Sequence, residues 1–190
     1  MIRINQEFLD FINKCSTQSG FKDLIIEQQY KPKELIIKQE SKVLDVFIVR
    51  EGIAKCYLTE DTGKDFVQEF FGEGQIFGEV EMFNDEFSFC SIEALTPLSV
   101  LKISRENFIY LLSQNREFNW FILKLLASKI KYKGIRHSFN QSHSTETNLQ
   151  RLESRFPGLY GVIPKKDIAN YLGITERNLN RAIKTLKENS

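Results

Sequence analysis

The spacing of apolar residues changes along the chain and predicts regions of different secondary structure. Between Ile4 and Cys15, apolar residues recur at three- and four-residue steps, which predicts a short amphipathic helix. From about Tyr30 onward, short runs rich in β-branched and aromatic residues alternate with turn residues. The runs are residues 35–37, 43–49, 53–58, 65–71, 87–95 and 98–103. Many short strands at close spacing predict an antiparallel barrel or jelly roll.

After Ile103 the pattern becomes helical. Ser104 is a suitable N-cap for a helix that reaches Leu112, and a second helix is predicted over residues 116–137. A helix of that size is about 30 Å long at about 1.5 Å per residue. Residues 138–147 are polar without an apolar period, so we expect a loop or hinge there. Three further helices are predicted at 147–155, 165–172 and 175–188.

These elements divide the chain into three parts. We expect a sensor barrel with flanking helices at 1–112, a long dimerisation helix at 113–138 and a helix-turn-helix domain at 139–190. The predicted fold class is α+β, with an N-terminal antiparallel β jelly-roll barrel and a C-terminal winged-helix-like domain.

The stretch KKDIANYLGITERNLNRAIKTLKE, residues 165–188, has the spacing of a helix-turn-helix. Ala169 is small where two helices would approach, and Gly173 tolerates the positive φ of a sharp turn. Thr175 stands where an N-cap is needed for the second helix. The alternative interpretation is a plain three-helix bundle with a charged, solvated face.

The predicted DNA-binding residues lie on the outward face of this motif. A helix fits the DNA major groove, where Arg, Asn and Glu side chains read base edges, while Lys side chains suit phosphates. The candidate residues are Lys165, Lys166, Thr175, Glu176, Arg177, Asn178, Asn180, Arg181 and Lys184.

The charge distribution agrees with a nucleic-acid partner for the second half. The whole chain has a net charge of +1, but residues 1–100 carry 10 basic and 18 acidic residues, whereas residues 101–190 carry 16 basic and 7 acidic ones. A basic half joined to an acidic half suggests that the second half alone meets a polyanion.

The long helix is the predicted dimer contact, because helix-turn-helix proteins usually bind DNA as two-fold pairs. Its apolar positions could form a coiled-coil-like seam, although Ser128 and Lys129 interrupt it. The candidate interface residues are Phe118, Phe121, Ile122, Leu125, Lys129 and Tyr132. So wide an apolar surface indicates two buried faces, one against the barrel and one against a second copy.

The order of these parts resembles the Crp/Fnr superfamily of transcription regulators over nearly the whole chain. The stretch GEGQIFGE, residues 72–79, looks like that family's turn and phosphate-binding cassette, and Gly52 looks like its conserved barrel glycine. The stretch DIANYLGITERNLNRAIK is similar to its helix-turn-helix. The resemblance implies a cyclic-nucleotide-binding-like barrel. In members that bind cyclic nucleotides, the cassette Glu holds the ribose, and an Arg a few residues later holds the phosphate.

The sequence departs from that pattern at the phosphate. Ser88 or a neighbour occupies the place of the Arg, and no Arg or Lys occurs between Lys64 and Lys102. We therefore expect no response to cyclic AMP. The pocket, if open, is predicted to involve Gly78, Glu79, Val80, Ser88 and Phe89; it holds a less anionic effector or is filled by aromatic side chains. Glu79 either holds a sugar or contacts a neighbouring turn or helix.

Other chemistry has little support in the sequence. Cys15, Cys56 and Cys90 are too scattered for a metal or iron–sulfur site, and no His precedes His137, as a cupin-like enzyme would require. We expect no cofactor and no enzyme activity. The start of the chain lacks the pattern of a signal peptide, and no apolar run could span a bilayer, so we expect a cytoplasmic protein without membrane contact.

The predicted function is a sequence-specific DNA-binding regulator that acts as a homodimer on a near-palindromic site in double-stranded DNA. RNA polymerase is a further candidate partner, although the sequence does not locate a patch for it. The alternative is a small-molecule sensor that acts through protein partners and carries a degenerate DNA-binding domain.

Overall fold

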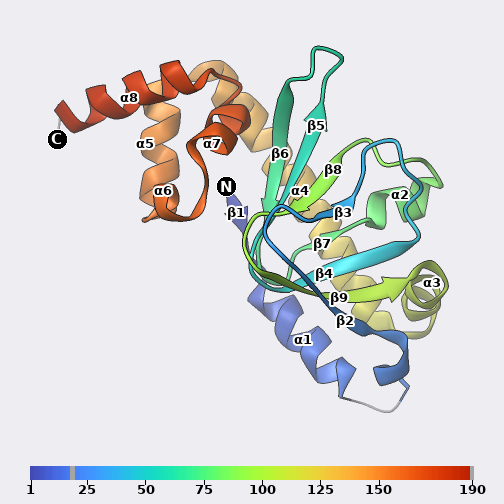
Figure 1. Cartoon of the computed structure of the whole chain (residues 1–190). Coiled ribbons are helices and arrows are strands. Elements are labelled where there is room, and N and C mark those ends of the chain that lie inside the picture. Colours follow the sequence, from blue (N-terminus) through green and yellow to red (C-terminus); the bar gives the residue numbers. More distant parts are fainter. Residues whose placement is uncertain (18–19, 189–190) are drawn as a thin grey trace.

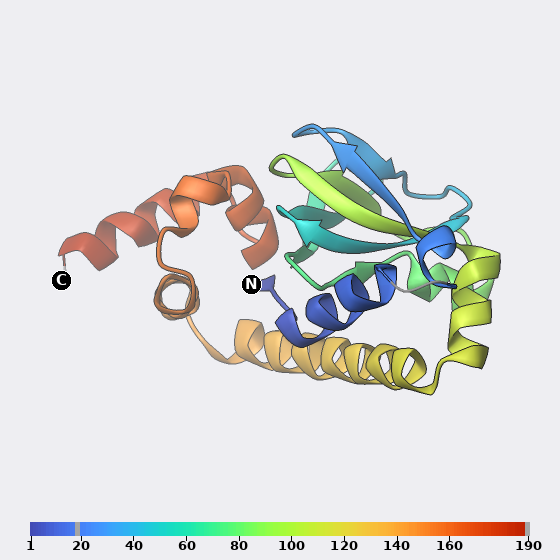
Figure 2. The ribbon, with the colours of Figure 1, turned by 90° about the horizontal axis from the view of Figure 1, so that it is seen from below.

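The structure, a computed structural model, describes residues 1–17 and 20–188. Two antiparallel sheets form the barrel, helix α4 runs along its side, and the C-terminal helices gather at the end of α4 that is far from α3 (Figures 1 and 2). This arrangement confirms the predicted α+β class and the order of barrel, long helix and helical C-terminal domain. None of the described helices is long and apolar enough to cross a membrane.

The barrel pairs a five-stranded sheet, in the order β1-β6-β5-β8-β3, with a four-stranded sheet, in the order β2-β9-β4-β7. Its strands are β1 (Ile2–Arg3), β2 (Ile26–Tyr30), β3 (Leu35–Ile37), β4 (Asp45–Glu51), β5 (Ala54–Thr59), β6 (Asp65–Phe71), β7 (Ile76–Phe77), β8 (Ser91–Ala94) and β9 (Leu98–Ser104). All pairs are antiparallel except β1 with β6. The expected jelly-roll barrel is therefore confirmed.

The predicted strands agree with the structure to within one or two residues except at 87–95, where the prediction is too long. Only Ser91–Ala94 is a strand, and Phe87 makes an isolated bridge with Lys42. The sequence also missed β1, β2 and β7. These segments are two residues long or, in the case of β2, mostly polar, so they lack the alternation that marks a strand.

Helices cover the barrel and connect it to the C-terminal domain. They are α1 (Gln6–Ser16), α2 (Glu79–Asn84), α3 (Arg105–Gln114), α4 (Arg116–Ser142), α5 (Thr145–Arg155), α6 (Leu159–Val162), α7 (Lys165–Leu172) and α8 (Glu176–Glu188), with the 3₁₀ turn η1 at Lys22–Leu24. Ser104 caps α3 as expected, because its hydroxyl accepts from the backbone N–H of Asn107. The short helices α2 and α6 were not predicted.

Aromatic rings join α1, α3 and α4 beneath the barrel. The ring of Phe121 lies 5.5 Å from that of Phe8 and 4.7 Å from that of Phe11, and Phe108 meets Phe118 edge-on at 5.8 Å. These side chains belong to the same apolar core as the inward residues of both sheets. One face of α4 is therefore fixed against its own barrel.

The hinge predicted at 138–147 is wrong for its first half, because α4 continues through Ser142 and α5 begins at Thr145. The domain boundary expected at 138 therefore falls inside a helix. Phe139 explains the continuation: its ring stacks on His143 at 4.5 Å, and the Arg151 guanidinium lies 3.2 Å from its centroid. These contacts hold a polar segment in helical form.

The C-terminal domain packs on the outer face of β6. Val67 and Phe70 of that strand are fully buried in one apolar core with residues of α5, α7 and α8, and the Phe70 ring lies 5.6 Å from Tyr171. Lys55 on β5 adds an ion pair of 3.2 Å to Asp167 on α7. The described residues of this domain from 145 to 188 contain no strand. The predicted helix-turn-helix is therefore present, but these residues do not form the β-wing of a winged helix.

Candidate DNA-binding surface and effector pocket

The helix-turn-helix is formed by α7 and α8, and its turn has the geometry that the sequence predicts. Gly173 adopts φ +71° and ends α7, and Ala169 is 1% exposed where the helices meet. The Thr175 hydroxyl accepts from the backbone N–H of Asn178 at 3.2 Å, which caps α8. Because Leu179 is fully buried on the inner side, the register of α8 fixes which residues face outward.

All nine residues proposed for DNA contact are exposed. Lys165 donates to the Asn180 Oδ1 at 3.0 Å and so connects α7 to α8 across this surface. Lys184 pairs with Glu188 at 3.6 Å, but both side chains are largely in solvent, so this pair leaves the lysine free to exchange partners. Arg177 and Arg181 lie one turn apart on α8 and make no side-chain hydrogen bond or ion pair with any residue that the structure describes. The surface thus presents cations and amides on a rigid, capped helix.

The five residues predicted for the effector pocket do line one cavity in the barrel. They are Gly78, Glu79, Val80, Ser88 and Phe89. Gly78 has φ +87°, and a Cβ there would lie 2.7 Å from the Asp45 carbonyl oxygen, so the turn before α2 requires glycine. The cavity has a volume of about 50 Å³, whereas pockets for drug-sized ligands occupy roughly 300–1,000 Å³.

A buried ion pair occupies the place of a ligand at Glu79. The carboxylate is fully buried, and its Oε1 accepts from Lys129 Nζ at 2.6 Å. Lys129 Nζ also donates to the Ile76 carbonyl oxygen at 2.6 Å, and the residue is only 8% exposed. Of the two roles considered for Glu79, the structure therefore shows contact with a helix. The sequence missed this partner, because Lys129 lies 50 residues away on a face assigned to dimerisation.

The cavity that would hold a cyclic phosphate is lined by three carboxylates, from Glu69, Glu79 and Glu81, and by two lysines, Lys129 and Lys133. Ser88 is buried and donates to the Cys90 carbonyl oxygen at 2.7 Å, and its hydroxyl lies 3.1 Å from the Glu81 carboxylate. Glu69 also lines the cavity, where Arg3 holds it at 2.7 Å. Phe89 does not fill the cavity, since it is 48% exposed, and Lys133 lies 5.8 Å from its ring. Carboxylates at these positions repel a phosphate.

The predicted dimer interface needs correction, because most of its residues face the protein's own barrel. Phe118, Phe121, Ile122 and Leu125 are at most 6% exposed, and Lys129 is engaged in the cavity. The Tyr132 hydroxyl lies 2.5 Å from that of Tyr171. The exposed apolar residues of α4 instead include Trp120, Leu123 and Ile130, at 62%, 52% and 74% exposure, and Ile135 at 41%. The sequence could not tell the two faces apart, since apolar residues occur on both.

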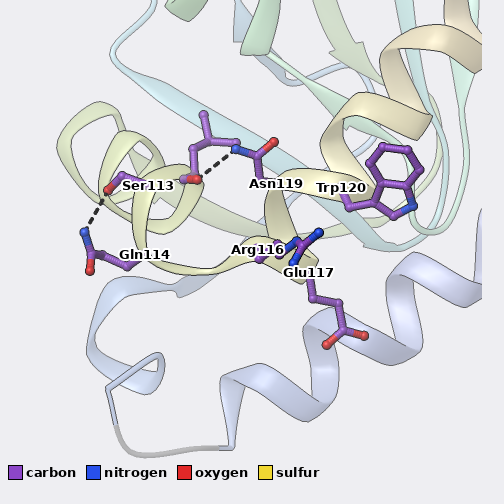
Figure 3. A pocket seen from close by; sticks show the side chains of 7 residues that line it. Ser113, Gln114, Arg116, Glu117, Asn119 and Trp120 are labelled. Carbon is purple, nitrogen blue, oxygen red and sulfur yellow. Dashed lines mark hydrogen bonds between the residues drawn. The ribbon is translucent and has the colours of Figure 1, made fainter.

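A hollow lies at the corner between α3 and α4 (Figure 3), at the opposite end of the molecule from α8 (Figure 2). Its volume is about 860 Å³, and its lining includes Arg116, Glu117 and the exposed Trp120. The Asn119 side chain donates to the Leu112 carbonyl oxygen at 2.9 Å and fixes the corner. This hollow adjoins the exposed apolar face of α4, and none of the residues predicted for the effector pocket lines it.

Removing one partner of the buried Glu79–Lys129 pair should destabilise the fold strongly. We expect Lys129→Met to lower the free energy of unfolding by about 3–5 kcal/mol, because it leaves a buried carboxylate unpaired. The double variant Glu79→Gln/Lys129→Met should lose less unfolding free energy than Lys129→Met alone, because it leaves no buried carboxylate unpaired. Urea unfolding measures both.

The exposed Lys133, one turn further along α4, provides the control for this pair. Lys133→Met should change the free energy of unfolding by no more than about 0.5 kcal/mol. Equal effects of Lys129→Met and Lys133→Met would contradict a stabilising role for the buried pair.

Comparison with known proteins supports this description of the barrel. Residues 27–115 match the family model of the cyclic nucleotide-binding domain. The chain is 32% identical over 124 residues to the potassium channel KAT1 of Oryza sativa subsp. japonica; the match covers 63% of this chain but only 17% of the channel. It is 22% identical over 172 residues to the cAMP-activated global transcriptional regulator CRP of Haemophilus influenzae, covering 84% of this chain and 76% of that protein.

A solved structure matches both parts of the chain together. A variant of CooA from Carboxydothermus hydrogenoformans superposes with a TM-score of 0.79 at 19% sequence identity, covering 98% of this chain and 87% of that one. The match therefore includes the barrel, the long helix and the helix-turn-helix. Residues 27–115 form a cyclic nucleotide-binding-type domain, and the chain as a whole has the fold of the Crp/Fnr-type transcription regulators.

Proposed function

We propose that the protein is a dimeric transcription regulator that reads a near-palindromic site in duplex DNA with α8 and does not respond to cyclic AMP. The exposed face of α8 carries this proposal. Arg177, Asn180 and Arg181 project from a helix that the Thr175 cap and the buried Leu179 hold in one register. A helix presented in this way fits the major groove.

The residues on this surface have different roles in the proposal. Arg177 and Arg181 can each bind the O6 and N7 of guanine, and Asn180 can pair with adenine, once the bond from Lys165 exchanges. Glu176 can accept from cytosine. Lys165, Lys166 and Lys184 contact phosphates, which set the position of the domain without reading sequence. Thr175 and Asn178 take part mainly through the cap that orients α8.

The second copy would pair along the exposed face of α4. Trp120, Leu123, Ala127 and Ile130 are all exposed and follow one another at steps of three, four and three residues. This is the a/d spacing of a coiled coil, in which two helices bury such a stripe against each other. The hollow at the α3–α4 corner adjoins Trp120 and leaves room for the end of the partner helix. Dimerisation would place two copies of α8 about 34 Å apart, one turn of DNA.

The small volume and the lining of the barrel pocket support the proposed independence from cyclic AMP. A cyclic nucleotide needs a hydrogen-bonding partner for its ribose and a cation for its phosphate. Here the Glu79 carboxylate is already paired with Lys129, and Ser88 and Glu81 lie where the phosphate would bind. Opening the cavity would break a buried ion pair, which makes ligand entry unfavourable.

Replacing Arg181 by Ala should weaken specific DNA binding by roughly 1–3 kcal/mol and relax the preference at one base position. The measurement is fluorescence anisotropy on a palindrome selected from random duplexes, at two salt concentrations. Lys187→Ala, at the far end of α8, is the control and should preserve sequence preference. Unchanged affinity and preference in Arg181→Ala would refute the proposed contact with a base.

Placing charge on the exposed stripe of α4 should convert the dimer to a monomer. Leu123→Glu combined with Ile130→Glu puts carboxylates where two copies would otherwise bury apolar side chains. Sedimentation velocity measures the mass, and Ile109→Glu, which changes an exposed residue of α3, is the control. A dimer that persists in the double variant would exclude this face as the interface.

Cyclic AMP should leave DNA affinity unchanged within twofold when added at millimolar concentration to the dimer and its selected duplex. The small cavity and the Glu81 carboxylate beside Ser88 predict no binding, which isothermal titration calorimetry measures directly. A tenfold gain in DNA affinity on addition of cyclic AMP would overturn the proposed independence.

A further inference from the structure

A second cavity lies where the sensor part meets the DNA-binding part, outside the barrel. Residues of α4, α5 and α7 surround it, and its volume is about 140 Å³. Figure 2 shows these helices converging near the start of the chain. A water needs roughly 10–15 Å³ of such space, so the cavity has room for several waters or for a small polyatomic ion.

The lining of this junction cavity is strongly cationic. Arg136 of α4 and Arg151 and Arg155 of α5 all line it, and none of the described lining residues is acidic. Within residues 1–17 and 20–188, none of the three arginines forms an ion pair with a carboxylate. Glu69 on the neighbouring strand β6 is neutralised by Arg3 at 2.7 Å. Burial lowers the pKa of Arg151, and the positive charge of Arg155 lowers it further.

One N–H group of the Arg136 guanidinium has no hydrogen-bond acceptor among the described residues. Its terminal nitrogens donate to the carbonyl oxygens of Gln68, Val67 and Tyr171, the last two at 3.0 and 2.6 Å. Its Nε is buried and has no partner among the described residues. A buried donor without an acceptor costs about 1–3 kcal/mol, so an acceptor that reached it would be stabilised.

The neighbouring groups suit an oxyanion better than an apolar ligand. Asn140, Asn148 and Tyr132 are the polar, uncharged side chains among the lining residues. The Asn148 amide donates to the His143 carbonyl oxygen at 3.3 Å, and the Tyr132 hydroxyl lies 2.5 Å from that of Tyr171. The guanidinium of Arg151 lies over the Phe139 ring, which fixes its plane and reduces the entropy lost on binding. Planar guanidinium groups bind phosphate oxygens through two parallel hydrogen bonds, which a carbonyl or an apolar group cannot accept.

We propose that the junction cavity binds a small phosphoryl anion, either inorganic phosphate or the phosphate group of a small metabolite, between Arg136, Arg151 and Arg155. The site is separate from the barrel cavity and shares no lining residue with it. The five heavy atoms of a phosphate fit the volume of the cavity, and its negative charge offsets the positive charges of the three arginines. Arg155 is exposed at the rim, so the anion can enter from solvent.

Binding here would bear on the orientation of the DNA-binding domain. Arg136 connects α4 to β6 through Gln68 and Val67, and to α7 through the Tyr171 carbonyl oxygen. An anion that also drew Arg151 and Arg155 toward Arg136 would fix α5 against α4. This consequence for DNA rests on the proposed function, whereas binding of the anion itself does not.

Isothermal titration calorimetry of the full chain with inorganic phosphate, at constant ionic strength balanced with chloride, tests the site. We expect saturable binding of one phosphate per chain. Arg151→Gln and Arg155→Gln should each weaken it at least tenfold, because each removes a guanidinium from the lining. Arg136 is left intact, since its carbonyl bonds support the fold.

Lys187→Gln removes an exposed charge on α8 and is the matched control, with phosphate affinity expected within twofold of the parent. Circular dichroism and thermal unfolding confirm that each variant is folded. Absence of saturable binding would overturn the proposal, as would equal weakening by Lys187→Gln and Arg155→Gln.

A separate DNA titration distinguishes a free anion from a DNA phosphate as the natural occupant. DNA affinity is measured with and without phosphate for the parent and for Arg155→Gln. A phosphate effect on DNA affinity that Arg155→Gln abolishes supports a regulatory anion. Two results together would assign these arginines to DNA and reject the site. They are a loss of DNA affinity in Arg155→Gln that is the same with and without phosphate, and no phosphate binding by the parent in calorimetry. Failure of the parent protein to bind DNA, with its phosphate binding intact, would instead count against the proposed function.

Discussion

The packing of α4 along its own barrel is the constraint on which the remaining geometry depends. Rings of α1, α3 and the inner face of α4 form one aromatic layer with the sheets, in which Phe118 is fully buried. Once that face is fixed, the opposite face of the helix must point away from the barrel. The same rotation carries Lys129 into the barrel and Tyr132 toward the C-terminal domain. A single packing choice thus determines which residues can meet a second copy, which close the pocket and which join the two domains.

Electrostatics differ sharply between the two cavities that result. In the barrel, Glu69, Glu79 and Glu81 share a small space with Lys129 and Lys133. Lys129 pairs with Oε1 of Glu79, while Oε2 has no hydrogen-bond partner among the described residues. At the junction, three arginines surround a larger space without acidic neighbours in the lining. A buried charge is stable when a partner of opposite sign is near; Glu79 has such a partner in Lys129, whereas no described carboxylate pairs with the three junction arginines. This contrast places the more favourable environment for an anion outside the barrel.

The C-terminal domain is connected to the barrel by contacts of several kinds. Phe70 and Tyr171 contribute apolar packing, Lys55 and Asp167 an ion pair, and Arg136 hydrogen bonds to both sides. Burial opposes the charge of Lys55, but Asp167 and Glu93 more than offset it, so its pKa lies above the usual value. These contacts use backbone carbonyls and side chains from distant strands. They therefore fix the C-terminal domain against the barrel.

The sequence alone determined the elements and motifs that depend on local spacing. The barrel strands other than β1, β2 and β7 follow from the period of apolar residues. The Ser104 and Thr175 caps, the Gly173 turn and the outward face of α8 follow from capping and glycine geometry, and all of these act over a few residues. The cavity residues from Gly78 to Phe89 were likewise brought together as predicted. Tertiary structure alone decided which face of α4 is buried, that Lys129 pairs with Glu79, and that the polar segment after residue 137 stays helical. Each of these outcomes rests on a partner far away in sequence, and local patterns contain no information about such partners.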